Sequence, residues 1–245
     1  MYKLNKTSMR FQMNFEKKSY DIPKQISTQY IPDTSLTTNI IIYILCYNAS
    51  TYDFSKQYYS KYKWARPILM KYQDYTFENA FWKQLLEISD EWENCDMVGT
   101  ISYKAYKKIN LENMNNIIMN KLYLSKQFFA FNQSTNTLFN DKSDYSYKTK
   151  ILIKYMSDSL NNHINYKLSY CNYFMTTPEL MKQFINWHIN ICLPILLKNP
   201  LSYHKFIYNG NLTEIDLIKI WGKPYYPHIP FILERINLLF FKNYL

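Results

Sequence analysis

From Ile40 onward, apolar and polar residues alternate in blocks that have the lengths of strands and helices. The run Ile40–Tyr47 is apolar throughout and rich in β-branched residues, which is typical of a strand buried on both faces of a parallel sheet. Further strands are predicted at 66–72 and 95–103. A helix is predicted between those two strands, and this order of elements indicates an α/β domain.

That helix is predicted because apolar residues recur at intervals of three or four, which places them on one helical face. They are Phe77, Phe81, Leu85, Ile88 and Trp92. Thr76 is the expected N-cap of the helix. Glu78 lies in the expected first turn, where the helix dipole favours a carboxylate.

The pattern in the middle of the chain predicts a helix, a strand and a loop in succession. The helix is expected at 110–124 with Asn110 as its cap, and the strand at 126–133. Residues 134–148 are polar and rich in turn formers, so we expect a surface loop there.

Two further helix signals stand in the C-terminal third. Thr177 is an expected N-cap, with Pro178 at the first helical position. Pro194 is expected to kink or end that helix, because proline removes a backbone donor. Thr213 is expected to cap a later helix that ends before Gly222.

These patterns divide the chain into two parts. Residues 1–36 are polar and without clear periodicity, so they are predicted to form a tail or an outer wrap. Residues 37–245 are predicted to form one α/β domain with a Rossmann-like mixed sheet, flanking helices and a more helical C-terminal third.

Composition adds a basic character to this picture. Lysine and arginine number 29 against 19 acidic residues, which gives a formal net charge of +10. A basic surface suits nucleic acid, anionic membranes or phosphate-bearing substrates. The lysines are scattered, however, with no run of five or more, and this favours a solvated basic surface without a stable nucleic-acid partner.

The cysteines and the lengths of the apolar runs indicate the cellular compartment in which the protein is expected. Four cysteines lie far apart without a C-x-x-C or Cys/His cluster, which argues against structural zinc and for reduced thiols in the core. The first residues lack the apolar core of a signal peptide, and no run approaches the ~20 residues of a membrane span. We therefore expect a cytoplasmic protein without a transmembrane segment.

Several specific motifs are missing from the sequence. There is no G-x-G-x-x-G, no P-loop, no G-x-S-x-G and no H-E-x-x-H, and the chain has only three glycines. Dinucleotide-binding and P-loop enzymes are disfavoured on this ground. No Asp-x-Asp occurs either; Glu214 and Asp216 have a similar spacing, but they lie at an expected helix start.

Two segments carry candidate chemistry. The first combines Tyr170, Asn172 and Tyr173, whose flat rings and amide suit recognition of a sugar, although core packing is the better explanation for each ring by itself. The second, WGKPYYPHIPFILER, holds His228 between restricting prolines and then the pair Glu234 and Arg235 near the start of a final apolar helix.

Five motifs in this order resemble one known family. They are IYILCYN, FENAFWKQL, DMVGTISYKAYKKI, YCNYFMTTPELM and GKPYYPHIPFILER. Together they resemble the small glycosyltransferase domains of giant DNA viruses and of bacterial capsule and surface-polysaccharide loci, over roughly residues 38 to 241. The resemblance implies a GT-A-like fold, a nucleotide-sugar donor with a UDP-sugar favoured, and a glycan acceptor. For a viral protein it implies the host cytoplasm.

The resemblance also implies places for donor-binding residues. Tyr47 and Asn48 would lie near the nucleotide, at the end of the first strand. Thr100 and Ser102 would lie where such enzymes place metal-binding acids, and because neither is acidic, dependence on manganese or magnesium stays open. The diphosphate would then need cationic groups instead. The candidates are Arg66, Lys104 and Arg235.

An inverting transfer needs a general base for the acceptor hydroxyl. Glu234, His228 and Asp96 are the candidates, with Glu234 and His228 preferred. Two other hypotheses remain beside this one: a basic nucleic-acid-binding module, and a catalytically inactive structural protein derived from a transferase.

Overall fold

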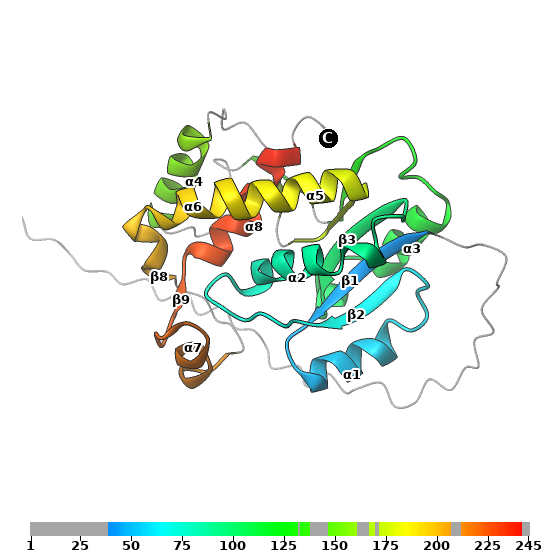
Figure 1. The fold of residues 1–245 in the computed structure, drawn as a ribbon, viewed down its shortest axis with the longest axis horizontal. Helices are drawn as coiled ribbons and strands as arrows, with labels where there is room; N and C mark the ends of the chain where they lie inside the picture. Colours follow the sequence, from blue (N-terminus) through cyan, green and yellow to red (C-terminus); the bar gives the residue numbers. More distant parts are fainter. Residues whose placement is uncertain are drawn as a thin grey trace, which may run out of the picture. The chain divides into compact units, whose positions relative to one another are not determined.

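The computed structural model describes residues 39–131, 133–137, 147–160, 167–169, 172–206 and 212–241, so the predicted tail at 1–36 lies outside it. Its centre is a five-stranded sheet with the order β2-β1-β3-β7-β4. Figure 1 shows β1, β2 and β3 side by side in this sheet. The strands are β1 (Ile40–Cys46), β2 (Ala65–Leu69), β3 (Met97–Ser102), β4 (Phe128–Ala130) and β7 (Phe174–Thr176).

The sheet is mixed. β1 is parallel to both β2 and β3, whereas β7 is antiparallel to β3 and to β4. The α/β class and the mixed sheet flanked by helices are therefore confirmed. The three strands predicted in the first half, together with the one at 126–133, all occur with shifted ends.

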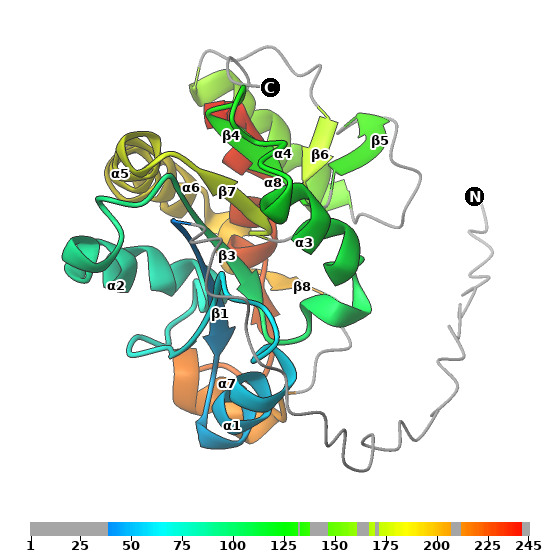
Figure 2. The same cartoon turned by 90° about the vertical axis from the view of Figure 1, so that its right-hand side faces the viewer.

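Helices cover both faces of this sheet, as Figure 2 shows for α2 and α5 on one side and α3 on the other. Their bounds are α1 (Ala49–Tyr58), α2 (Phe81–Glu87), α3 (Leu111–Met119) and α5 (Pro178–Trp187). Alternation along β1 explains the two layers: Ile42 and Ile44 pack toward α1 and α3, while Tyr43 and Leu45 pack toward α2 and α5.

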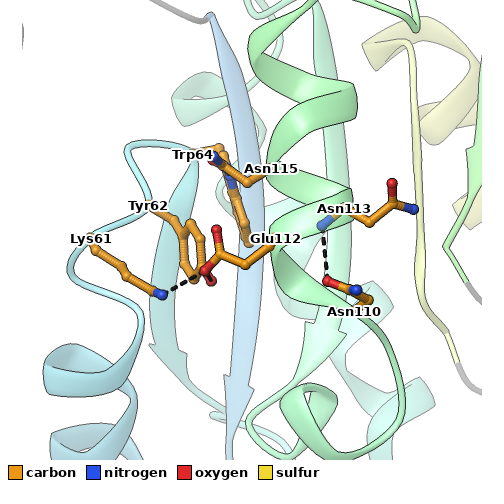
Figure 3. Close-up of polar contacts among 7 residues, drawn as sticks. All are labelled: Lys61, Tyr62, Trp64, Asn110, Glu112, Asn113 and Asn115. Carbon is orange, nitrogen blue, oxygen red and sulfur yellow. Dashed lines mark hydrogen bonds and ion pairs between the residues drawn. The ribbon is translucent and has the colours of Figure 1, made fainter.

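Polar contacts fix α3 against the segment that leads into β2 (Figure 3). The Glu112 carboxylate accepts hydrogen bonds from Lys61 at 2.6 Å and from the Tyr62 hydroxyl at 2.8 Å. The Trp64 indole donates to the Asn115 side chain at 3.0 Å. These contacts hold α3 and the segment before β2 together on one face of the sheet.

The C-terminal third is mainly helical, as the pattern predicted, and adds a second core. That core lies among α4 (Tyr147–Ser159), α6 (Leu193–Leu197) and α8 (Ile229–Phe241). The remaining elements are α7 (Glu214–Trp221) and two pairs of short strands: β5 (Gln133–Thr137) with β6 (Lys167–Ser169), and β8 (Lys205–Phe206) with β9 (Tyr226–Pro227).

Most helix ends agree with the sequence patterns. Asn110 caps α3 by accepting a hydrogen bond from the Asn113 amide, and Pro178 is the first residue of α5. Thr213 and Asp216 form a reciprocal capping box at α7, and Gly222 ends that helix with a left-handed φ of 84°.

The predictions at Thr76 and at the loop 134–148 were wrong. Thr76 makes no side-chain cap, because its amide and hydroxyl both donate to Asp74, and the α-helix begins later. Residues 134–137 of the predicted loop belong to β5. The connection between β1 and β2, for which no element was predicted, contains α1. Glu234 lies in the second turn of α8, near the start of the last helix as expected.

Pro194 does not end the helical run. A π-helical segment, His188–Cys192, joins α5 to α6 (Figure 1). Pro194 lies in the first turn of α6. The wider π turn just before the proline absorbs its missing backbone donor. In the part of the chain that the model describes, no helix has the length and apolar character needed to cross a bilayer.

Candidate functional site

The order of the strands creates a switch point between β1 and β3. From β1 the chain passes through α1 to β2 on one side, and it then returns through α2 to β3 on the other side. In open α/β sheets, ligands bind in the crevice outside the carboxyl ends of the strands at such a point. The carboxyl ends of β1 and β3 are therefore the expected place for a site.

Tyr47 and Asn48 follow β1 directly at this edge. Asn48 is the N-cap of α1 and accepts a hydrogen bond from the Thr51 amide at 3.0 Å. The Tyr47 hydroxyl donates to Glu78 at 2.8 Å, and its ring packs edge-on against that of Tyr103, which follows β3. Both strand ends thus contribute side chains to one place.

Glu78 is the acid that the sequence patterns missed. It lies in a 3₁₀ turn, η1 (Phe77–Ala80), and burial raises its pKa. The segment that leads into this turn is tied to the residue after β1 by Gln73, whose side-chain amide donates to the Tyr47 carbonyl at 2.7 Å. Phe77, directly before Glu78, has a φ of 51°, a left-handed conformation that is strained for a bulky residue and is found most often near functional sites.

Glu234 is the second acid, and it comes from α8, which packs against η1. Its pKa is raised to about 7, first by burial and then by the negative charge of Glu78. The positive charges of Arg235 and Lys108 oppose this rise. Two carboxyl groups that influence each other in this way are typical of sites that move protons.

A group of lysines follows the carboxyl end of β3. Burial, and next the charge of Lys107, lower the pKa of Lys104. The charges of Lys104 and Lys108 also favour the ionised form of Glu78. Lys108 lies with its ammonium 5.6 Å from the centre of the Tyr173 ring. This crowding of cations would favour an anionic ligand such as a phosphate.

The remaining polar groups near this edge are bonded within the protein. The Thr100 hydroxyl donates to the Asn172 carbonyl at 2.6 Å, and the hydroxyls of Ser102 and Tyr173 lie 2.5 Å apart. All four residues are buried. Of the residues expected to bind an acceptor, Asn172 and Tyr173 therefore serve internal contacts, and Tyr170 lies outside the described residues.

Other expected site residues lie elsewhere in the fold. Asp96 precedes β3, and the strand's six residues separate it from the carboxyl edge by about 20 Å. Arg66 is exposed near the amino end of β2 and donates to the carbonyls of Lys63 and Ala65. The structure does not bring either residue to the edge that Tyr47 occupies.

His228 is buried where β9 meets α8. Its Nδ1 lies 3.3 Å from the Thr149 hydroxyl of α4, and its ring packs against Phe206 of β8. Burial lowers its pKa to about 4, so the ring is neutral at neutral pH. Arg235 lies beside Glu234 and donates to the Phe231 carbonyl one turn earlier.

A sequence signal for Glu78 existed, since it stands in the motif FENAFWKQL, but a carboxylate in a first helical turn has an ordinary explanation. Only the packing of η1 near the end of β1 and against α8 distinguishes Glu78 from other carboxylates in first helical turns. Lys108 was likewise one of many scattered lysines.

The donor set does not fit a resident divalent metal. Glu78 already accepts a hydrogen bond from the Tyr47 hydroxyl, and the positive charge of Lys108 acts on both Glu78 and Glu234. Among the described residues, no group of three or more His, Cys, Asp or Glu side chains is arranged to hold an ion.

Comparison of the chain with models of protein families, with curated proteins and with solved structures finds no match.

Proposed function

We propose that the protein is a glycosyltransferase that moves a sugar from a nucleotide-sugar donor, with a UDP-sugar favoured, to a glycan acceptor. The observation that carries the proposal is the meeting of Glu78 and Glu234 with the lysines after β3, at the carboxyl edge of β1 and β3. This edge offers a cationic side for a diphosphate and an acidic side for an acceptor hydroxyl.

A GT-A-like fold is part of the same proposal. The support for it is the mixed sheet, the helices on both faces and the position of the acidic pair at a switch point. The order of the motifs that resemble capsule and surface-polysaccharide enzymes supports a surface glycan as the acceptor.

Glu234 is the proposed general base. A carboxylate with a pKa of about 7 is well matched to accept a proton at neutral pH. It takes the proton of the acceptor hydroxyl while that oxygen bonds to the anomeric carbon. The bond from this carbon to the diphosphate oxygen breaks, and the diphosphate leaves with the electron pair. This single displacement inverts the anomeric configuration.

The cations have a separate task in this reaction. Lys104 and Lys108 would hold the diphosphate and offset the charge that develops on it as it leaves. Glu78 keeps Glu234 basic through its negative charge, and Tyr47 fixes Glu78 by a hydrogen bond. His228 and Asp96 are given no role in proton transfer, because their contacts lie elsewhere.

A thermal-shift screen of nucleotide sugars, with and without manganese, tests donor binding. A ligand that binds only the folded state at 100 times its Kd stabilises it by about 2.7 kcal/mol, so a donor is expected to raise the midpoint clearly. Lys104→Ala is expected to lose this response. Arg66→Ala removes a cation far from the site and is expected to keep it.

Transfer itself is tested with Glu234→Gln, using release of the nucleoside diphosphate in the presence of surface glycans. This variant is expected to bind the donor but to lose turnover by a factor of roughly 100 or more. Asp96→Asn, at the opposite end of β3, is the matched control and is expected to keep wild-type turnover. If no nucleotide sugar shifts the wild-type midpoint, the proposal fails. Binding without turnover in the wild-type protein would indicate the inactive structural alternative.

A further inference from the structure

Three buried asparagines form a chain behind the two acids. Asn79, Asn172 and Asn237 are 4%, 1% and 2% exposed. The Asn237 amide donates to the Asn172 side-chain oxygen at 2.5 Å, and the Asn172 amide lies 3.4 Å from the Asn79 side-chain oxygen. Three elements that are distant in sequence, namely α8, the start of β7 and η1, are thereby joined through side chains alone.

One end and the centre of this chain are tied to backbone groups. The Asn79 amide donates to the Thr76 carbonyl at 3.1 Å, inside the turn that presents Glu78. At the centre, the Asn172 carbonyl accepts the Thr100 hydroxyl from β3. Each asparagine is also close in sequence to a group of the candidate site. Asn79 follows Glu78, Asn172 precedes Tyr173, and Asn237 lies three residues after Glu234, on the same side of α8.

Burial of three amides is costly unless they are bonded, and apolar residues of similar volume would fill the space at lower cost. Polar groups that bond one another in a core instead select one arrangement of the elements that carry them. The three side chains are bonded to one another, although the Asn237 side-chain oxygen has no hydrogen-bond partner among the described residues. Here the elements that the network fixes are those that hold the two acids.

We propose that the chain Asn79–Asn172–Asn237 is a positioning device that sets the separation of the Glu78 and Glu234 carboxylates. The asparagines touch no substrate in this role. They act through the helix and the turn that present the acids. The proposal concerns the acidic pair itself and does not depend on which reaction the pair performs.

Several charged groups and burial together set the pKa of Glu234. Burial and the negative charge of Glu78 disfavour its ionised form, while the positive charges of Arg235 and Lys108 favour that form. Tyr47 donates to Glu78 from the other side. A change in the spacing of the two acids therefore alters the repulsion from Glu78, whereas a general loss of stability leaves the ionisation of Glu234 unchanged.

Carbon-13 NMR of glutamate-labelled protein, without substrate, measures the ionisation midpoint of Glu234, assigned with Glu234→Gln. In Asn237→Leu the link from α8 is lost, and we expect the midpoint to fall by about one pH unit as the acids move apart. Asn115→Leu is the control. It removes an amide of α3 that accepts a hydrogen bond from the Trp64 indole, and it is expected to lower stability without moving the Glu234 midpoint (Figure 3).

An unchanged Glu234 midpoint in folded Asn237→Leu overturns the proposal. Should that variant not fold, Asn237→Ser decides, because its shorter hydroxyl cannot replace the contact with Asn172 but keeps a polar group in the buried position. The same fall in the midpoint is expected there, and an unchanged midpoint again overturns the proposal. Because no nucleotide sugar is present, failure of this test is distinct from failure of the proposed transferase activity.

Discussion

At the scale of single residues, burial decides the behaviour of the titratable groups. Burial and the negative charge of Glu78 raise the pKa of Glu234 to about 7, whereas burial lowers the pKa of His188. His188 lies in the π-helical segment against the rings of Trp82 and Phe184 and is 1% exposed. Neither of its ring nitrogens has a hydrogen-bond partner among the residues that the model describes.

His188 should make the protein sensitive to acid. Burial lowers its pKa to about 3 from 6.5, so the unfolded chain binds a proton that the folded chain does not bind between those values. The free energy of unfolding is therefore retained above about pH 6.5 and falls as the pH drops toward 3, by at most about 1.4 kcal/mol for each pH unit. Urea denaturation at a series of pH values measures this slope.

In His188→Leu we expect a shallower loss of stability below pH 6.5, since the group that takes up the proton is gone. Ile191 is exposed in the same π-helical segment, so Ile191→Ala is the matched control and should keep the wild-type slope. Equal slopes in the wild-type protein and in His188→Leu would contradict the burial argument.

At the scale of elements, the close approach of β3 and β7 depends on one glycine. A Cβ built on Gly99 would lie 2.3 Å from the Phe174 carbonyl oxygen and 2.9 Å from a methyl carbon of Ile42. The backbone oxygen cannot move without breaking the strand pairing. Gly99 therefore sets the distance between β3, which carries the lysines at its end, and β7, which begins beside Tyr173.

Gly99→Ala is expected to destabilise the protein by about 1–3 kcal/mol, because the added methyl forces β3 and β7 apart. Donor binding should weaken as well, since β3 ends and β7 begins at the candidate site. Gly222→Ala is the comparison: nothing lies within 4 Å of its Cβ, and only the left-handed backbone opposes it, at about 1–2 kcal/mol. It should leave donor binding unchanged. Thermal midpoints and donor titrations check both variants.

At the scale of the whole molecule, the charge of +10 predicts weak association with any polyanion. One surface group adds rings to this charge: Phe54, Tyr58 and Tyr106 pack on one another, and Lys107 lies over the Tyr106 ring. Rings and lysines together are what a single-stranded nucleic acid requires, so the alternative function can be tested here.

We expect single-stranded DNA to bind only at low salt, with an affinity that falls steeply between about 50 and 200 mM salt and does not change in Tyr58→Ala. Fluorescence anisotropy of a labelled oligonucleotide measures both effects. Binding that persists at the higher salt and is lost in Tyr58→Ala would favour the nucleic-acid-binding function over the transferase.

The sequence alone determined the class of the fold and the ends of several helices and strands. The β-branched run at Ile40 predicts a buried strand, and the caps at Asn110 and Thr213 act through neighbouring atoms, so local patterns suffice. Thr76 failed as a cap because Asp74, two residues away, bonds its amide and hydroxyl, and this competition is invisible in a helical pattern.

Only the tertiary structure decided which residues share the site. Glu78, Glu234 and Lys108 are far apart in sequence, and each has an ordinary local explanation although each stands in one of the five motifs. Asp96 stands in such a motif as well, and Arg66 adjoins an apolar segment. Strand direction separates the two groups, because it places the carboxyl ends of β1 and β3 at one edge and Asp96 at the other. The raised pKa of Glu234 depends on burial and on the charge of Glu78, and neither exists before α8 and η1 pack together.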